Sequence, residues 1–432
     1  MFLHKVFKSY GAQLLSTRNM WAYPHYQSVQ IKSKKRDDIP NPLEEILRWV
    51  KAALYNIFPY GEEVVVNNIK FDAPPPYVIG DYMLSVFVLG RSFHQDPSYL
   101  AKRIEGYCSK EFFPLVKKVY AVGPYLNIEV DREIYYKKIL DHIYDQGNLF
   151  GTHQQGNSQA VRINYLSNDL RASLIGQVIG RYYEWGGHTV FRENFTTDNA
   201  RLVPIGRAVI RDALKYNVAK YIADTNVVTT SQTKNSPSLI LQKQDKSLTR
   251  YTLYLAQERE LIEKGQPSIS IYISLIEQAE ITGSLIVNAK RLRYIQPKTN
   301  ISTIFINETK MEKYISDEHR ALHYAILRTP SHKKVLITPE SLLVYSRLTD
   351  SIQQLREGYR ENETADFDLA KLLVTFPMIV ANIGYTHMVD KLCIYLEKIL
   401  DLCQKQDIYN QDKRLSNAVA VVLQNGLDVL IS

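Results

Sequence analysis

The amino-acid sequence predicts a multidomain α/β protein, with a small α+β domain at the N-terminus, an open parallel sheet in the middle and an all-α bundle at the C-terminus. Three observations lead to this fold class. The chain has 432 residues, more than one hydrophobic core usually holds, since domains average about 150 residues. β-rich and helical segments alternate through its middle. After Thr338 the strand patterns end and only helical periodicity continues.

Composition and charge narrow the function classes. Hydrophobic residues make up 45% and charged residues 23% of the chain, which is typical of a soluble globular protein. No apolar run approaches the roughly 20 residues that span a bilayer, so we expect no membrane partner. The formal net charge of +8 favours a polyanionic partner, although much of the excess lies in the first 36 residues. The cysteines, Cys108, Cys393 and Cys403, are too few and too scattered for a disulfide framework or a zinc site, which predicts a reducing compartment and no metal.

The first 38 residues have the composition of a targeting segment. Apolar side chains recur at helical spacing from Phe2 to Leu14, and no acidic residue precedes Asp37. The basic residues are Lys5, Lys8, Arg18, Lys32, Lys34, Lys35 and Arg36. A basic, acid-free amphipathic helix is typical of a mitochondrial transit peptide, so we expect a mitochondrial location. The alternative interpretation of residues 1–38 is a disordered basic arm or the first helix of the domain.

Residues 39–131 are expected to form the small α+β domain. Apolar residues recur every three or four positions over 41–58, which predicts a helix. Further along we expect a strand over 63–71, a helix that begins near Asp81, a helix over 97–113 and the β-rich run VKKVYAVGPYLNIEV.

Residues 132–337 are expected to hold the parallel sheet. A helix over 132–146 and a glycine- and glutamine-rich loop lead into it. The strand AVRINYLS, the helix LRASLIGQVIGRYYEW and the strand HTVFRENF then predict a βαβ unit, which implies parallel strands with a right-handed crossover. PSLILQKQ and SISIYIS are predicted strands of the same sheet on either side of a helix over 252–265. The polar tract VVTTSQTKNSPS predicts a loop.

Residues 338–432 are expected to form the all-α bundle. Four amphipathic segments predict helices over about 339–359, 365–382, 386–405 and 411–430. The last segment places apolar or small residues on one face: Leu415, Val419, Val422, Gly426 and Leu430.

Three sequence motifs are more specific, and they occur one after another along the chain. They are GDY (80–82) with GPYLNIEV (123–130), LRASLIGQVIGRYYEWGGHTVFRENFTTD (170–198) and RLSNAVAVVLQNGLDVLIS (414–432). Together they resemble class I arginyl-tRNA synthetases, over most of the chain after the first 38 residues and weakly in the middle. The resemblance implies a tRNA-contacting N-terminal domain, a Rossmann-like catalytic-type domain and an anticodon-binding bundle. The expected parts are therefore 1–38, 39–131, 132–337 and 338–432.

The turn before Leu170 departs from the family pattern. In active class I synthetases this turn carries His-x-Gly-His, whose histidines stabilise charge at the ATP phosphates and whose glycine lets the backbone approach the nucleotide. Here Asp169 stands at the place of the second histidine, and His-x-Gly-His occurs nowhere in the chain. Two like charges about 4 Å apart repel by roughly 4 kcal/mol at an effective dielectric of 20, so this carboxylate should disfavour ATP.

Two further family sites are altered. The Lys-Met-Ser-Lys loop, whose lysines neutralise the transferring phosphates, is matched by TKMEKYIS, with Lys310 and Lys313 as remnant positions on either side of Glu312. The alternative is an ordinary charged loop. At the arginine-recognition site TTDNARL keeps Asp198, which either faces a guanidinium or is a solvent-facing aspartate without a function. About 140 residues separate Arg171 from Lys310, fewer than the family uses, which indicates a trimmed domain.

The bundle offers candidate RNA contacts. YSRLTDSIQQLREGYR carries cationic and aromatic side chains beside apolar positions, a combination suited to splayed RNA bases, and basic residues near 413 suit phosphates. The candidates are Tyr345, Arg347, Arg356, Tyr359, Arg360, Lys413 and Arg414. The alternative is a solvated helix face with core tyrosines.

The sequence therefore favours an arginyl-tRNA synthetase-like pseudoenzyme that binds tRNA or another structured RNA, rather than DNA, without aminoacylation and without a cofactor. Two alternatives stay open. One is a divergent mitochondrial arginine–tRNA ligase that uses ATP and Mg²⁺, in which His188 and Lys310 would be the first residues to mutate. The other is a non-catalytic scaffold that binds a protein partner in a tRNA-modification or mitoribosomal complex.

Overall fold

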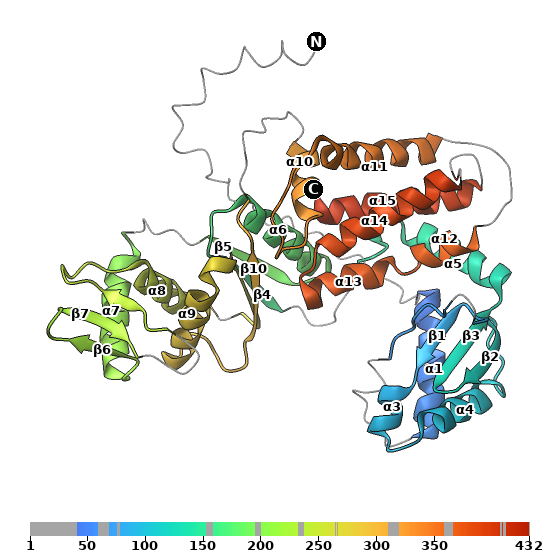
Figure 1. Ribbon diagram of the computed structural model, residues 1–432, viewed down its shortest axis with the longest axis horizontal. Coiled ribbons are helices and arrows are strands. Elements are labelled where there is room, and N and C mark those ends of the chain that lie inside the picture. Colours follow the sequence, from blue (N-terminus) through green and yellow to red (C-terminus); the bar gives the residue numbers. More distant parts are fainter. Residues whose placement is uncertain are drawn as a thin grey trace, which may run out of the picture. The chain divides into compact units, whose positions relative to one another are not determined.

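The computed structural model describes most of the chain after residue 40 (Figure 1). The described residues are 41–58, 69–75, 78–152, 159–194, 200–231, 237–263, 265, 267–309, 319–357, 366–406, 408 and 412–431. By its internal contacts the chain divides after Asp38, into Met1–Asp38 and Ile39–Ser432. The first unit lies outside the described residues, so the targeting segment stays a prediction.

The N-terminal part is a three-stranded antiparallel sheet with helices beside it. Its elements are α1 (Pro42–Ile57), β1 (Tyr82–Ser85), α3 (Phe87–Ser92), α4 (Pro97–Cys108), β2 (Val116–Val122) and β3 (Tyr125–Val130), with the strand order β1-β3-β2. The helix predicted to begin near Asp81 is wrong, because β1 occupies that place. Burial alternates along β1, with the side chains of Tyr82 and Leu84 buried, and Tyr82 pairs with Ile128 of β3. The predicted strand over 63–71 lies mostly outside the described residues.

The Gly-Asp-Tyr turn before β1 joins this sheet to a helix of the bundle. The Asp81 carboxylate is buried and accepts a hydrogen bond from the Val130 amide at 3.0 Å. Lys371 of α12 (Phe367–Leu373) donates to the Asp81 carbonyl at 3.0 Å. The motif thus has a structural role at the contact between the N-terminal sheet and the bundle.

The centre of the chain is a four-stranded parallel sheet. Its strands β4 (Ala160–Tyr165), β5 (Thr189–Asn194), β9 (Ile269–Leu275) and β10 (Asn300–Ile306) lie in the order β10-β9-β4-β5. Helix α6 (Leu170–Trp185) connects β4 to β5, and α9 (Ala279–Arg291) connects β9 to β10. The predicted βαβ unit is confirmed. Because the two connections run outward in opposite directions, the strand order reverses between β4 and β9, which makes this pair a topological switch point.

A second sheet is inserted between β5 and β9. It contains β6 (Ala219–Ile222), β7 (Val227–Thr230) and β8 (Ile240–Gln242), is antiparallel, and packs with α7 (Leu202–Lys215) and α8 (Arg250–Glu263). Two predictions are corrected here. The strand predicted in PSLILQKQ belongs to this sheet instead of the parallel one, and the tract predicted as a loop begins with β7. The β-branched side chains of Val228 and Thr230 are buried, which favours a strand over a loop.

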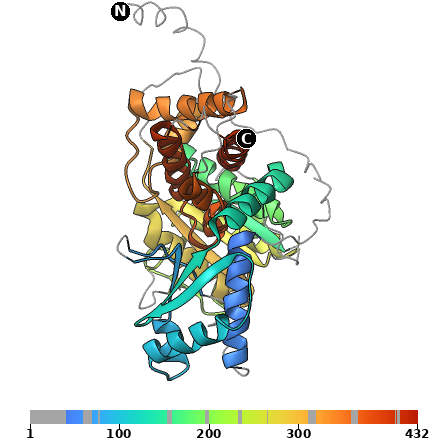
Figure 2. The ribbon, with the colours of Figure 1, turned by 90° about the vertical axis from the view of Figure 1, so that its right-hand side faces the viewer.

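The C-terminal part is a helical bundle, as predicted. Its helices are α10 (His319–Leu327), α11 (Pro339–Glu357), α12, α13 (Phe376–Thr386), α14 (Asp390–Lys405) and α15 (Lys413–Leu430), and α5 (Arg132–Gln146) packs against α12 and α15 (Figure 2). The segment predicted as one helix over 365–382 is two helices, because the chain turns between Leu373 and Phe376 and Pro377 starts α13. All five residues predicted on the inner face of α15 are buried.

One described segment, Phe367–Thr386, is long and apolar enough to cross a membrane by composition alone, with a mean hydropathy of 1.5. The sequence-based expectation that no apolar run approaches this length therefore needs correction. The segment is broken into α12 and α13, and both helices contact α14 in the bundle. Core helices of a bundle and membrane spans share this composition, and 39% of the apolar window of Phe367–Thr386 is buried within the fold.

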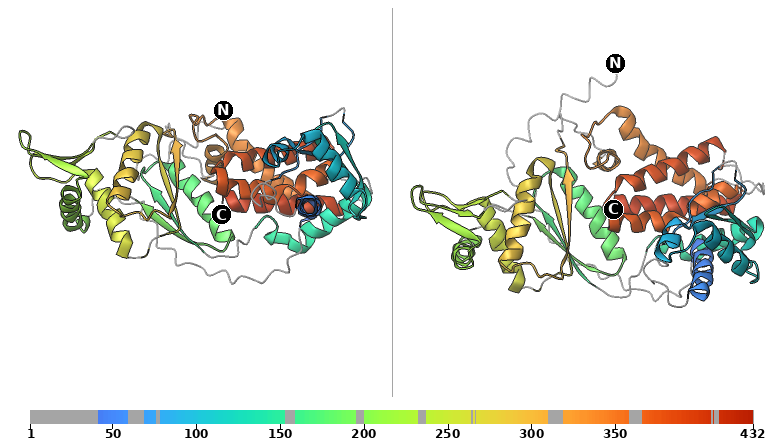
Figure 3. Two further views of the ribbon diagram at one scale, coloured as in Figure 1. Left: turned by 90° about the horizontal axis from the view of Figure 1, so that it is seen from below. Right: turned by 60° about the horizontal axis from the view of Figure 1, so that its bottom comes forward.

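Helix α6 lies between the parallel sheet and the bundle (Figure 3). Tyr182 packs against Gly384 of α13, where a Cβ atom would lie 2.2 Å from the tyrosine ring. Arg181 donates to the carbonyls of Val429 and Leu430 at 2.7 and 2.6 Å, at the end of α15. Burial, together with the nearby Arg192, lowers the pKa of Arg181 to about 10. The crossover helix of the βαβ unit therefore also holds the last helix of the bundle in place.

Candidate functional site

The candidate site is the carboxyl edge of the parallel sheet at the switch point, where doubly wound folds bind ligands. β4 ends at Tyr165, and α6 begins at Leu170 after a four-residue turn. β10 ends at Ile306 at the same edge, because all four strands are parallel. Residues 310–318, which hold Lys310 and Lys313, follow β10 and lie outside the described residues. The turn between β4 and α6 is therefore the part of the site that can be examined directly.

Asp169 links this turn to the segment after β10 through hydrogen bonds. It is the N-cap of α6, and its Oδ1 accepts a hydrogen bond from the Arg171 amide at 2.8 Å. Its Oδ2 accepts from the Thr309 amide at 2.9 Å, and the Thr309 hydroxyl donates to Oδ1 at 3.3 Å. The Ser167 hydroxyl accepts from the Asp169 amide at 3.1 Å, which orients the turn. The carboxylate is thus held by donors from both sides of the site.

Arg171, the second residue of α6, is turned into the protein. Its side chain is fully buried, with Nη1 donating to the Lys333 carbonyl at 2.7 Å and Nη2 donating to the Thr329 and Pro330 carbonyls at 2.6 Å each. Burial lowers the pKa of Arg171, and the nearby Asp169 carboxylate opposes that shift. The guanidinium therefore fixes the loop between α10 and α11 and is not presented to a ligand outside.

The turn between β4 and α6 does not fit the phosphates of a nucleotide. A helix N-terminus attracts anions through its free amides and its dipole, but here the Asp169 carboxylate supplies the negative charge and takes the Arg171 amide. A phosphate oxygen about 4 Å from the carboxylate would meet roughly 4 kcal/mol of repulsion at an effective dielectric of 20. The turn Leu166–Asp169 also has no glycine that would let the backbone approach a phosphate closely.

A second polar cluster lies beside the switch point, on the face of the parallel sheet opposite α6. Arg162 of β4 donates from Nη2 to Glu258 of α8 at 2.6 Å, and the Tyr272 hydroxyl of β9 donates to the same carboxylate at 2.8 Å. The side chains of Arg162 and Glu258 are only 5% and 12% exposed. Burial is the largest single influence and lowers the pKa of Arg162, but Glu258 and Tyr272 together outweigh it and raise the pKa above its ordinary value. Burial has the opposite effect on the Tyr272 hydroxyl and raises its pKa.

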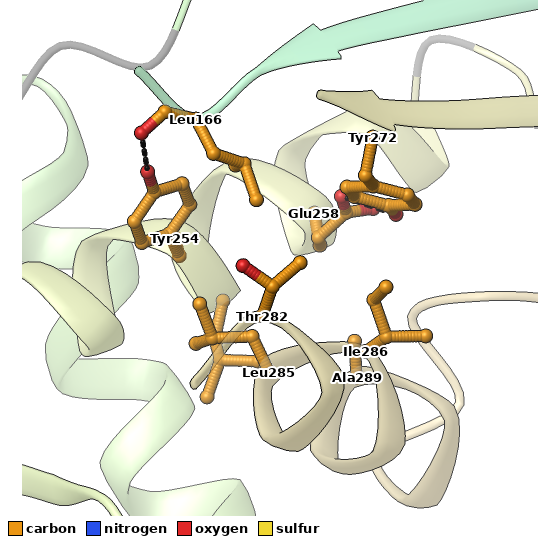
Figure 4. Close-up of a pocket in the computed structure, with 9 residues that line it drawn as sticks. Leu166, Tyr254, Glu258, Tyr272, Thr282, Leu285, Ile286 and Ala289 are labelled. Atoms are coloured by element: carbon orange, nitrogen blue, oxygen red, sulfur yellow. Dashed lines mark hydrogen bonds between the residues drawn. The ribbon is translucent and has the colours of Figure 1, made fainter. Parts of the chain in front are cut away.

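This cluster borders a pocket of about 270 Å³, a volume that includes space open to solvent (Figure 4). Most of the lining is apolar and comes from α8, α9 and the residue after β4. The Tyr254 hydroxyl points to the Leu166 carbonyl and donates to it at 3.2 Å. Glu258 is the carboxylate in the lining, and Arg162 already neutralises it. A cationic ligand entering the pocket would have to compete with this internal guanidinium.

The structure does not gather the predicted RNA contacts of α11 on one face. Tyr345 packs inward, with its ring centroid 6.2 Å from that of Tyr324. Arg347 and Arg356 are exposed, but they are nine positions apart along the helix, which places them about half a turn apart around its axis. Tyr359 and Arg360 lie outside the described residues.

Two other predicted contacts stand at the start of α15. Lys413 and Arg414 are exposed, and Arg414 forms an ion pair with Asp141 of α5. Asp198, the predicted guanidinium partner, lies outside the described residues. His188 precedes β5 at the amino edge of the sheet, about 20 Å from the carboxyl edge for a six-residue strand. It is therefore far from Asp169.

Sequence reasoning missed the cluster of Arg162, Glu258 and Tyr272. One weak signal was present: an arginine in the otherwise apolar strand AVRINY needs a buried partner. Its partners come from α8 and β9, about 100 residues away, and no spacing in the sequence indicates that contact. In the part of the chain that the structure describes, no group of three or more His, Cys, Asp or Glu side chains is arranged to hold a metal ion.

Comparisons with known proteins agree with this fold. No protein-family model matches the chain. It is 31% identical over 108 residues to the arginine–tRNA ligase of Clostridium botulinum strain Hall, a match that covers 25% of this chain and 19% of that protein. It is 26% identical over 142 residues to the arginine–tRNA ligase of Thermococcus kodakarensis, covering 31% of this chain and 22% of that protein. The matched segment thus spans about a fifth of each relative.

Solved structures extend the likeness to the whole fold. The arginyl-tRNA synthetase of Plasmodium falciparum superposes with a TM-score of 0.66 at 10% identity, covering 90% of this chain and 98% of that one. That of Thermus thermophilus gives 0.64 at 13% identity, with the same coverage. At these identities the structures show the fold alone. The chain is therefore arginyl-tRNA synthetase-like, in sequence over about a quarter of its length and in fold over 90% of it.

Proposed function

We propose that this arginyl-tRNA synthetase-like chain binds tRNA or another structured RNA without attaching arginine to it, and that it acts in the mitochondrion. The RNA half of the proposal is supported by relatives named as arginine–tRNA ligases. The location is supported by the basic, acid-free composition of the first 36 residues.

The observation that carries the absence of aminoacylation is the carboxylate of Asp169. It stands at the N-terminus of α6, accepts the Arg171 amide and is joined to Thr309 on the far side of the site. A carboxylate in this position repels the phosphates that an adenylate-forming enzyme must hold. Its hydrogen bonds also use the donors that would otherwise receive those phosphates.

The pocket beside the switch point supports the same proposal. Its carboxylate, Glu258, is paired with Arg162 at 2.6 Å and accepts from Tyr272 at 2.8 Å. The carboxylate is therefore already neutralised by an internal guanidinium and offers no unpaired negative charge to the guanidinium of arginine. The Asp169 turn therefore disfavours the phosphates of ATP, and the paired Glu258 offers no free carboxylate to arginine.

The test combines arginine-dependent exchange of pyrophosphate into ATP with RNA binding by the same purified full-length chain. We expect no exchange above the background without arginine, and salt-sensitive binding of a tRNA-Arg transcript. A DNA duplex of equal length is the control for non-specific attraction to phosphate. Robust exchange would refute the first half of the proposal and establish the ligase alternative. Failure to bind tRNA more tightly than the duplex would refute the second half.

The bundle residues can be tested in the same binding assay. Replacing Arg347 and Arg356 by glutamine should weaken tRNA binding if α11 contacts RNA. Replacing Lys391 and Lys398, exposed lysines of α14, removes the same charge and serves as the matched control. For the location, residues 1–38 fused to a fluorescent protein should reach mitochondria, and a diffuse signal would count against that part of the proposal.

A further inference from the structure

Helix α7 carries an exposed row of cations that the proposed RNA contacts of the bundle do not include. Arg207, Arg211 and Lys215 follow one another at intervals of four residues and are exposed. Residues four apart lie on the same face of a helix, about 6 Å apart along its axis. The opposite face of α7, formed by Leu202, Gly206, Val209, Ile210 and Ala213, is buried in the core of the inserted part.

The end of α7 extends this row with two further side chains. Lys215 lies over the Tyr216 ring, 5.5 Å from its centroid, and the tyrosine is 55% exposed. Arg291, from the end of α9, donates to the Asn217 carbonyl at 3.3 Å and is exposed. We call Arg207, Arg211, Lys215, Tyr216 and Arg291 the α7 basic face. It combines cations at regular spacing with an accessible aromatic ring.

Helix stability does not explain this row. Lys215 and Arg291 stand in the last turns of their helices, where cations favour the dipole. Arg207 and Arg211 stand in the body of α7, and like charges four residues apart destabilise a helix. The one acidic residue of α7, Asp212, is engaged elsewhere, because it accepts from Arg259 at 2.7 Å and from Tyr294 at 2.8 Å. The repulsion within the row is therefore uncompensated by an acid of the same helix.

We propose that the α7 basic face binds the phosphate backbone of an RNA, with Tyr216 available to stack on a base. The axial spacing of the cations is close to the separation of successive phosphates along a nucleic-acid strand. Cations beside an exposed aromatic ring are the arrangement used to hold RNA strands. Helix α7, which carries this face, packs with α8 and β6 in the inserted part (Figures 1 and 3). This inference rests on the proposed function and adds a second RNA contact to it.

The test compares full-length wild type with the variant Arg207→Gln, Arg211→Gln, Lys215→Gln. Glutamine keeps the helix propensity and removes the charge. The matched control is Lys243→Gln, Lys246→Gln, Lys298→Gln, which removes three exposed cations elsewhere. Binding of a fluorescent tRNA transcript is measured as a function of salt. Loss of three phosphate contacts should weaken binding about tenfold or more and reduce the salt slope by about 2 to 3, whereas the control should bind like wild type.

The outcomes separate this inference from the proposed function. If wild type binds tRNA and the α7 variant keeps the same affinity and salt slope, the basic face is not an RNA contact and the inference is overturned. If wild type binds neither tRNA nor a second structured RNA, both proposals fail together. Because charge repulsion within α7 is relieved, the variant should unfold at the same or a higher temperature than wild type. A lower unfolding temperature would mean that the row has a structural role, which also overturns the inference.

Discussion

Replacing Asp169 by alanine tests the closure of the site at α6. The change removes the acceptor of the Arg171 amide and of the amide and hydroxyl of Thr309. Loss of an N-cap costs about 1 kcal/mol, and loss of a hydrogen bond to a charged acceptor about 1.5–3 kcal/mol. The free energy needed to open this contact should therefore fall by about 2–4 kcal/mol.

The Tm of global unfolding would be insensitive to this local loss of stability. For the unit Ile39–Ser432, the unfolding entropy of about 2.1 cal/mol/K per residue means that 1 kcal/mol shifts Tm by only about 1 °C. Amide hydrogen exchange reports the local opening directly. A loss of about 2–4 kcal/mol predicts roughly 30- to 700-fold faster exchange at the amides of Arg171 and Thr309. Amides in β4 should exchange at their wild-type rates.

The variant Asp169→Asn separates the two halves of the contact. Asparagine caps helices about as well as aspartate, so the Arg171 amide should keep its protection. Its amide group has only one oxygen, so an acceptor at the Thr309 amide is lost and that amide should exchange faster. If both amides exchange as in wild type in both variants, the hydrogen bonds of Asp169 do not hold the site closed and the reasoning is wrong.

Three further predictions follow from other contacts. Glu258→Gln leaves a buried guanidinium without its carboxylate and should destabilise the protein by about 3–5 kcal/mol, measured by urea unfolding. Gly384→Ala forces a methyl group into the Tyr182 ring and should cost about 1–3 kcal/mol in the same assay, with little loss contradicting the packing. Burial lowers the pKa of His188, whose Nδ1 accepts from the Gln159 amide. Because the unfolded state then binds the proton more tightly, the contribution of His188 to stability is full above about pH 6.5 and is lost as the pH falls below it. A His188→Gln variant should show a flatter decline, and an unchanged decline would contradict this role.

Local patterns in the sequence were sufficient to predict the long helices. Helix α6 was predicted over its observed range because a polar cap, an apolar stripe and a Gly-Gly stop all occur within 20 residues. The inner face of α15 was predicted for the same reason. Such elements bury one continuous face, so their periodicity alone determines which residues are inside.

Short elements and contacts between distant segments were not predictable in this way. β1 has four residues, too few for alternation to be distinguished from the start of a helix. β7 begins a tract whose polar composition hides the burial of its β-branched side chains. The paired charges of Arg162 and Glu258 come from different elements, and only the folded sheet brings them together.

Equilibrium binding of labelled ATP with Mg²⁺ to the full-length chain is the most direct test of the central claim, that a carboxylate at the start of α6 excludes nucleotide phosphates. We expect no saturable binding up to millimolar ATP, with or without arginine. Saturable binding that a non-hydrolysable arginyl-adenylate analogue displaces would contradict the claim, because the nucleotide would then occupy the place that the hydrogen bonds of Asp169 are inferred to close.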